Sequence, residues 1–357
     1  MSRTGLTECV LVAAVWAEGL AEHESIDETR TVYRIRPGNL IPRLGKVARA
    51  LNLLIWMYRV VRVFKDRRVV LINCHSLLAL IPGVAIQMGT PAVIIYDPHE
   101  LETEKDGWGP AMRAVGRILE RLLVQRASAV VAVSDSIGNW YARTYRVSPV
   151  HVVRNVSYMT NALQRSTLLK ERLGIGAGEI LFIFQGSLSF GRGVELLGNA
   201  FSDVSPEKHI VFLGFGDLES WVKELAASYA NIHFHPAVGG EELLSFTSSA
   251  DVGFNIAEPT CTNHLYSLPN KIFEYIGSGL PIIVSDFPDM GHIVDEHDCG
   301  WKVDVSAEAV VELVNGITAD EVTAKRQNTL ACRHLFDWEK EIEPLLATAS
   351  EILKKRA

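Results

Sequence analysis

Short apolar runs alternate with amphipathic stretches along the second half of the chain, and this alternation limits the fold more than any other feature. The runs read as strands at Glu179–Gln185, His209–Leu213, Ile232–His235, Asp251–Ile256 and Pro281–Ser285. The stretches between them predict helices at Val194–Phe201, Leu218–Tyr229, Glu241–Ser249 and Pro269–Ile276. Strands that are apolar on both faces are typical of a parallel sheet covered by helices. The second half is therefore predicted to be a Rossmann-like domain.

The first half repeats the pattern less regularly. Strands are predicted at Val69–Asn73, Ala92–Asp97, Ala129–Ser134 and Val150–Arg154, with helices at Leu44–Val61, Leu77–Met88 and Pro110–Arg126. At the start, strands at Glu8–Val15 and Val32–Ile35 flank an acidic loop with one glycine and no helical periodicity. The usual first strand–helix unit, with its glycine-rich loop, is thus expected to be missing. A length of 357 residues suggests two domains, which we assign to residues 1–155 and 156–335, followed by a helical tail at 336–357.

Charge and cysteine usage exclude several classes of protein. The net charge of −7 is opposite to the basic excess of general nucleic-acid binders, so no nucleic-acid partner is expected. The cysteines are five in number, without a CxxC pair, which disfavours a disulfide framework or a zinc site and fits a reducing compartment. Because the N-terminus also lacks a secretory pattern, we expect a cytoplasmic location.

The segment Tyr266–Asp286 (YSLPNKIFEYIGSGLPIIVSD) carries the first candidate site. A helix with Pro269 at its first position, and with Ser267 as a possible cap, leaves the backbone N–H groups of Asn270 and Lys271 free, at the positive end of the helix dipole. Such a helix start binds anions, and a diphosphate fits it. Glu274 lies one turn further on the same face, where its carboxylate can accept hydrogen bonds from sugar or ribose hydroxyls. An ordinary capped helix with a solvated glutamate is the alternative, and the position at the carboxyl edge of the sheet favours the site.

Two glycine-containing turns are predicted at the same edge. The loop Gln185–Gly193 (QGSLSFGRG) contains Gly186, Gly191 and Gly193, which let backbone approach a phosphate, and Arg192, which can clamp one. The turn Leu213–Asp217 repeats the pattern with Gly214 and Gly216. Each turn alone is weak evidence, because tight strand–helix turns need glycine anyway. Together with Arg192 and Lys271 they indicate a nucleotide-diphosphate site.

The loop Tyr96–Glu104 (YDPHELETE) follows a strand of the first half and is rich in acids. One histidine beside carboxylates is poor evidence for a metal, so no metal site is predicted. Two interpretations stay open: a solvated acidic loop, or a loop that brings His99 into a cleft against an acceptor or a transferred sugar.

These strings resemble the family 4-type glycosyltransferases of the GT-B fold. The resemblance is strongest from Ile180 to Val305 and includes SLPNKIFEYIGSGLPIIVSD, typical of a subgroup with an LPNK string, and YDPHELE, VVAVSDSI and VVRN in the first half. It implies two Rossmann-like domains that face each other, a terminal helix that packs back on the first domain, and retaining transfer from a nucleoside-diphosphate sugar. That sugar nucleotide is a co-substrate, and no metal or other cofactor is implied.

The resemblance also assigns roles to single residues. It implies that Glu274 holds the nucleotide ribose, that Arg192 binds the diphosphate with Lys271 as a further cation, and that His99 lies near the transferred sugar. Gly186, Gly214 and Gly216 match the family's glycine turns, and Asn155 matches an asparagine at the domain junction. Tyr266 stands where the family has its first acidic residue, and Ser187 where it has a second phosphate-binding arginine.

The predicted function is a retaining hexosyltransferase-like activity toward a hydroxyl acceptor, a glycan or a lipid-linked sugar, in polysaccharide or glycolipid synthesis. Two alternatives are a non-catalytic, nucleotide-sugar-binding or scaffold relative, which the missing glycine-rich loop favours, and a sugar-nucleotide epimerase of the same fold, which the LPNK string disfavours.

Residues 43–68 allow two interpretations, one of which is contact with a membrane. The apolar stretch Leu44–Val61 is bracketed by basic residues: Arg43, Lys46, Arg49, Arg62, Lys65, Arg67 and Arg68. A core helix with solvated basic ends is the favoured interpretation. The alternative is a surface helix whose cations attract anionic lipid at the inner face of the plasma membrane.

Overall fold

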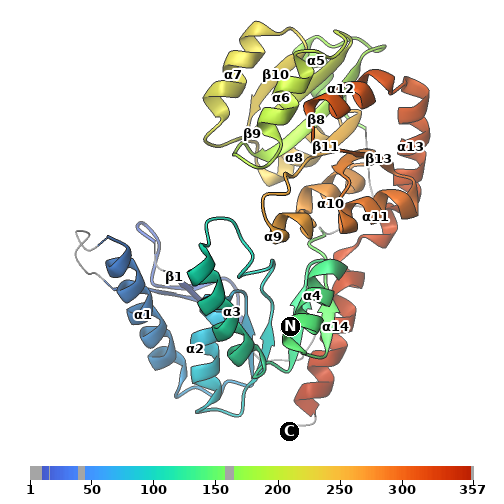
Figure 1. Cartoon of the computed structure of the whole chain (residues 1–357). Helices are drawn as coiled ribbons and strands as arrows, with labels where there is room; N and C mark the ends of the chain where they lie inside the picture. Colours follow the sequence, from blue (N-terminus) through green and yellow to red (C-terminus); the bar gives the residue numbers. More distant parts are fainter. Residues whose placement is uncertain (1–9, 16, 39–44, 157–164, 355–357) are drawn as a thin grey trace.

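The computed structural model describes residues 10–15, 17–38, 45–156 and 165–354, and it forms two lobes (Figure 1). Some predicted ranges, such as Glu8–Val15 and 43–68, reach partly outside the described residues. The lower lobe of Figure 1 contains the strands up to residue 152 and the upper lobe those from residue 180 onward. Both are built on parallel strands with helices packed against them, which confirms the predicted α/β class with two Rossmann-like sheets.

The first lobe contains two sheets. Parallel strands β4 (Leu71–Cys74), β5 (Val93–Tyr96), β6 (Ala129–Ala132) and β7 (Val150–Val152) pair in that order. A separate sheet pairs β3 (Arg30–Ile35) with β1 (Val10–Val15) on one side, in parallel, and with β2 (His23–Ser25) on the other, antiparallel. The short strand β2 lies between β1 and β3 in the chain, and residues 17–29 contain no helix. The sequence pattern that lacked a first helix is thus explained by a strand in its place.

Helices α1 (Gly45–Phe64), α2 (Leu77–Gln87) and α3 (Pro110–Val124) lie side by side on this lobe, and α4 (Asp135–Tyr145) follows β6 (Figure 1). The helix α1 is apolar on two faces, as the sequence shows. Trp56, Met57, Val60 and Phe64 are buried against β3 and α2, whereas Val47, Leu51, Leu54 and Tyr58 are exposed. Among the described helices, none combines the length and apolarity needed to cross a bilayer.

The second lobe has one six-stranded parallel sheet in the order β10-β9-β8-β11-β12-β13. Its strands are β8 (Ile180–Ser187), β9 (Lys208–Phe215), β10 (Ile232–Pro236), β11 (Val252–Asn255), β12 (Ile282–Ser285) and β13 (Gly300–Val303). Its helices are α5 (Leu168–Leu173), α6 (Val194–Phe201), α7 (Glu219–Ser228), α8 (Gly240–Thr247), α9 (Thr262–Leu265), α10 (Asn270–Gly277), α11 (Pro288–His297), α12 (Ala307–Gly316) and α13 (Ala319–Cys332). Buried apolar clusters on both faces of the sheet account for its continuous apolar strands.

The last helix, α14 (Trp338–Lys354), runs back along the first lobe (Figure 1). Leu345 and Ala349 pack against Ile95 and Val131 of the four-stranded sheet. Glu341 accepts hydrogen bonds from the Nε and backbone N–H of Arg154, at 2.9 and 3.1 Å. Just before α14, Phe336 packs into the second lobe against Phe273. The tail therefore ties the two lobes together.

Candidate functional site

A cleft of about 240 Å³ lies between the two lobes at the carboxyl ends of their strands. The first lobe contributes His99 and Glu100 after β5, Val133 and Ile137 at α4, and Asn155. The second contributes Gly191 and Arg192 before α6, residues 255–257 at the end of β11, Asn263 and His264 of α9, and residues 267–271 at the start of α10. The cleft thus brings together six of the residues singled out in the sequence: His99, Asn155, Gly191, Arg192, Asn270 and Lys271.

The start of α10 is open to the cleft. Pro269 precedes the helix with extended backbone (φ −68°, ψ 146°), and no described side chain caps the helix start. Ser267, which could have capped it, donates instead to the carbonyl of His264 at 2.8 Å. The first N–H groups of α10 therefore point outward without a side-chain partner among the described residues, as an anion site requires.

Lys271 is the most perturbed charged group at the cleft. Burial lowers its pKa from 10.5 to about 7, with a further decrease from the nearby Arg192 and an opposing increase from Glu274. Its Nζ atom lies 3.9 Å from the centre of the Phe184 ring, an attractive cation–π contact. Exposed Arg192 and shielded Lys271 place two cationic side chains next to an open helix start. A bound anion would relieve the repulsion between them.

Glu274 is not among the residues that line the cleft, and its carboxylate is held by Gln185. The Nε2 of Gln185 donates to Glu274 Oε2 at 2.5 Å, and Gln185 Oε1 accepts from the hydroxyl of Thr247 at 2.7 Å. Because both ends of the Gln185 amide are engaged, the amide orientation is fixed and so is the carboxylate. Sequence reasoning missed Gln185 and Thr247, whose contacts depend on the packing of α8 and α10 against the sheet.

The glycines divide into two groups. Gly191 lines the cleft, and Gly186, with φ 117°, has open space where a side chain would point. Gly214 is different, because a Cβ atom there would lie 1.8 Å from the carbonyl oxygen of Gly186, so the two strand ends could not approach. Close contacts of the same kind surround Gly193, against Ile256, and Gly216, against Leu188. Packing alone accounts for Gly193, Gly214 and Gly216, and the cleft lining does not include them.

Tyr266 is placed away from the cleft lining as well. Its side chain packs against the apolar core of the first lobe, and its carbonyl accepts a hydrogen bond from the Ser134 hydroxyl at 2.8 Å. The residue at the position of the family's first acid thus contacts the other lobe. Asn263, which the sequence analysis did not single out, does the same: its side chain accepts from the Leu101 N–H at 2.8 Å and donates to Glu100 at 2.9 Å.

The loop after β5 is not a solvated acidic loop. Leu101, Glu102, Thr103 and Glu104 are all buried. Glu104 accepts hydrogen bonds from the guanidinium of Arg117 at 2.6 and 2.7 Å, and Glu102 accepts one from Lys105 at 3.1 Å. Burial raises the pKa of Glu102, and Lys105 opposes that shift. The acids therefore anchor the loop that carries His99.

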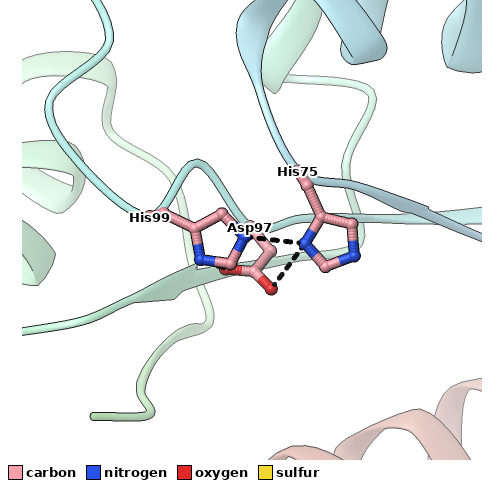
Figure 2. A group of neighbouring side chains, drawn as sticks. All are labelled: His75, Asp97 and His99. Carbon is pink, nitrogen blue, oxygen red and sulfur yellow. Dashed lines mark hydrogen bonds and ion pairs between the residues drawn. The ribbon is translucent and has the colours of Figure 1, made fainter. Parts of the chain in front are cut away.

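His99 lies at the tip of this loop with φ 59°, in the left-handed region where histidine is tolerated better than most residues. Its ring faces His75, which follows β4, and Asp97, which follows β5 (Figure 2). The His75 Nδ1 lies 2.9 Å from His99 Nε2 and 3.2 Å from Asp97 Oδ2, and His99 Nδ1 lies 3.5 Å from Asp97 Oδ1. His75 and Asp97 are further residues that the sequence analysis did not assign to the site.

Two groups of described residues bring metal-ligating atoms within 4.8 Å of one another: His75, Asp97 and His99, and Asp106, Cys261 and His264. From the sequence alone, one histidine with the acids of the β5 loop is poor evidence for a metal, and the structure adds His75 after β4. In the second group the Thr260 hydroxyl donates to Asp106 at 2.6 Å and contacts His264 Nδ1 at 2.9 Å, so hydrogen bonds already join these residues.

A second hollow, of about 560 Å³, is open and shallow and lies over Glu195, Leu196, Glu258 and Thr260. It offers two carboxylates and no cation, which disfavours an anionic ligand. The cleft between the lobes is the better candidate, because it combines cations, an open helix start and residues from both lobes.

Comparisons with known proteins define the class. Residues 8–156 match the family model Glycosyltransferase Family 4, and residues 179–320 match the model Glycosyl transferases group 1. The two matches together take up most of the chain and follow its two lobes. The chain belongs to the glycosyltransferases that these two models describe, and its two lobes have the GT-B fold.

Solved structures support the fold. The chain is similar to sucrose-phosphate synthase from Thermosynechococcus elongatus, with a TM-score of 0.73 at 16% identity over 97% of this chain and 89% of that one. It is also similar to HepE of Anabaena in complex with UDP and glucose, with a TM-score of 0.69 at 15% identity over 90% and 86%. WaaG, a glycosyltransferase involved in lipopolysaccharide biosynthesis, gives 0.60 at 14% identity over 92% and 88%. No curated protein matches the chain in sequence.

Proposed function

We propose that the chain transfers a hexose-like sugar from a nucleoside-diphosphate donor to a hydroxyl acceptor, with retention of configuration at the anomeric carbon. The observation that carries this proposal is the cleft, where His99 of one lobe faces Arg192, Asn270 and Lys271 of the other. The similar structure of HepE is in complex with UDP and glucose, a nucleoside diphosphate and a sugar. The donor diphosphate would bind at the start of α10, and the transferred sugar would lie toward His99.

The charges of the cleft fit the leaving group. Negative charge develops on the diphosphate as the glycosidic bond breaks, and fixed positive groups that face it stabilise the transition state. Arg192, Lys271 and the N–H groups of α10 supply such charge from the protein itself, so we propose transfer without an essential metal. Glu274, oriented by Gln185, would accept hydrogen bonds from the ribose hydroxyls.

The acceptor side is proposed to meet a membrane, which would fit a lipid-linked acceptor in polysaccharide or glycolipid synthesis. The outer faces of α1 and α3 expose apolar stripes: Val47, Leu51, Leu54 and Tyr58, and Met112, Val115, Ile118 and Leu122. Residues 45–68 contain seven Lys and Arg against one acid, Asp66. Residues 110–126 contain four Arg against one acid, Glu120, which is buried, and two of the four, Arg113 and Arg117, pair with Glu104. Apolar stripes flanked by cations are typical of helices that lie on anionic lipid. This supports the alternative for 43–68, and we propose that the enzyme works at the cytoplasmic membrane face.

A thermal-shift panel tests the donor proposal. Nucleoside diphosphates and their sugars are added one by one, and a ligand that binds the native state raises the unfolding temperature. We expect stabilisation by one base class, reduced in Glu274→Ala and in Lys271→Met. A panel without any stabilising nucleotide would contradict the proposal.

A non-catalytic nucleotide-sugar-binding relative is the second candidate, and the strand β2 in place of a first helix favours it. That protein would be stabilised by the same nucleotide but would release no nucleoside diphosphate from any donor. Transfer and binding assays on one preparation therefore separate the two candidates.

A further inference from the structure

His75 and His99, which lines the cleft, meet edge to edge (Figure 2). Their ring planes differ by only 6° and the ring centres lie 5.0 Å apart. The facing nitrogens, His75 Nδ1 and His99 Nε2, are 2.9 Å apart. This distance is shorter than the distance between the ring centres by nearly twice the radius of an imidazole ring. This is possible only if both nitrogens lie near the line between the rings, as in an in-plane hydrogen bond.

The neighbour of His75 decides the direction of that hydrogen bond. The side-chain amide Nδ2 of Asn73 lies 3.1 Å from His75 Nε2. An amide nitrogen can only donate, so His75 Nε2 accepts, and the single proton of neutral His75 is on Nδ1. Nδ1–H then donates to His99 Nε2, and neutral His99 must carry its own proton on Nδ1. The tautomer of His99 is thus assigned from the hydrogen-bond network.

This tautomer leaves a donor in the cleft. Among the described residues, the partner of His99 Nδ1 is Asp97 Oδ1 at 3.5 Å, beyond the usual length of a hydrogen bond. His99 lines the cleft, and the side chain is about half exposed. Its Nδ1–H is therefore available to an incoming hydroxyl, while Nε2 is engaged by His75.

We propose that His75 is a positioning residue that selects the Nδ1–H tautomer of His99 and fixes its ring, so that His99 presents an N–H donor to a hydroxyl group of the bound sugar or acceptor. This inference rests on the proposed function for the role of His99, but the tautomer itself does not depend on it.

A metal ion would use the same atoms differently. Zinc lies about 2.0–2.1 Å from each histidine nitrogen and along its in-plane lone pair. With the two nitrogens 2.9 Å apart and pointing at each other, an ion at that distance from both would lie well off both lone-pair directions. Both rings would have to turn, and the contact with Asn73 would be lost. The hydrogen bond is the arrangement that this geometry fits.

Nitrogen NMR of ¹⁵N-histidine-labelled protein tests the tautomer directly, at about pH 8, where ordinary imidazoles are neutral. The His99 signals are identified by their loss in His99→Asn. We expect a protonated-type shift at Nδ1 and an unprotonated-type shift at Nε2. In His75→Ala we expect His99 to change to the Nε2–H form or a mixture, whereas His75→Asn, whose amide nitrogen replaces Nδ1 as donor, should keep Nδ1–H. The control His292→Ala, on an exposed residue of α11, should change nothing.

Three outcomes would overturn the proposal. They are an Nε2–H signal for His99 in the wild type, a His99 tautomer that is unchanged in His75→Ala, and wild-type signals that change when a chelator is added.

Kinetics test the consequence. His75→Ala should lower kcat by about 10- to 100-fold, the cost typical of removing the partner that orients a functional histidine. The donor KM should stay within about twofold, because the diphosphate groups are untouched. His75→Asn should recover most of the loss. Equal kcat in all three proteins would overturn the role of His75. If no protein turns over a donor, the proposed function fails, and the NMR result still decides the tautomer.

Discussion

The ammonium group of Lys271 lies 3.9 Å from the centre of the Phe184 ring, and its pKa is lowered from 10.5 to about 7. Burial is the main cause, and the charge of Arg192 adds to it. The site therefore has a cation whose protonation changes near neutral pH and which a phosphate would stabilise.

Nucleotide affinity should depend on pH through Lys271. Below about pH 7 the side chain is charged in the free protein, and above it a proton must be taken up when the diphosphate binds. Affinity is thus expected to fall as pH rises from 7 to 9, by at most tenfold per pH unit. Calorimetric titration with a nucleoside diphosphate at several pH values measures this. Lys271→Met should bind weakly with a flat profile, and the control Lys223→Met, on an exposed lysine of α7, should follow the wild type. A wild-type affinity that does not change with pH would contradict the assignment.

Replacing Glu274 by alanine should weaken nucleotide binding while the fold survives. A charge-assisted hydrogen bond to a hydroxyl is worth about 1.5–3 kcal/mol, which is roughly 10- to 100-fold in Kd. Titration of the variant with the stabilising nucleotide gives the value, and Glu312→Ala, on an exposed residue of α12, is the matched control. Affinity within twofold of the wild type would remove Glu274 from the donor site.

Arg192→Ala should reduce turnover more than donor binding. The charge on the leaving group is larger in the transition state than in the bound donor, so a cation that faces it contributes mainly to kcat. Steady-state kinetics with a varied donor separate the two parameters. A higher KM with unchanged kcat would mean that Arg192 only anchors the donor.

Vesicle co-sedimentation tests the apolar and basic face of α1 and α3. Binding to vesicles with anionic lipid should be strong at low salt and fall as salt rises, because each basic residue near the surface contributes about 1 kcal/mol. A triple variant with Arg62, Lys65 and Arg68 replaced by Gln should bind vesicles less than the wild type. A double variant with Val115 and Leu122 replaced by Asp should bind less at all salt concentrations. Arg67 is left in place, because it packs over Tyr33 and donates to a backbone carbonyl. If the protein does not sediment with anionic vesicles at low salt, the proposed membrane contact is contradicted.

The fold of the second lobe could be predicted from sequence because each strand is buried on both faces and reads as a continuous apolar run. The helix start at Asn270 and Lys271 followed from local rules in the same way. The site's supporting contacts could not be predicted. His75 and His99 are separated by a helix and a strand, and only the adjacent ends of β4 and β5 bring them together. Gln185 meets Glu274 for a similar reason.

The glycines show a limit of motif reasoning. A phosphate-binding turn and a close approach of two strand ends both require glycine at the end of a strand. Gly214 is accounted for by the second reason, its approach to the Gly186 carbonyl. Tyr266 stood at a family position, yet its ring packs against the opposite lobe. The local sequence identifies which residues lie at the carboxyl edge of the sheet, and tertiary packing decides which of them face the cleft.

Release of nucleoside diphosphate from the donor that stabilises the protein tests the central claim most directly. The reaction is followed with an acceptor-containing membrane extract, and the configuration of the transferred sugar is read by proton NMR. We expect release by the wild type, retention of the anomeric configuration, and loss of at least about tenfold of the rate in Arg192→Ala. A protein that binds the nucleotide yet releases none from any donor, or a product of inverted configuration, would contradict a retaining glycosyltransferase.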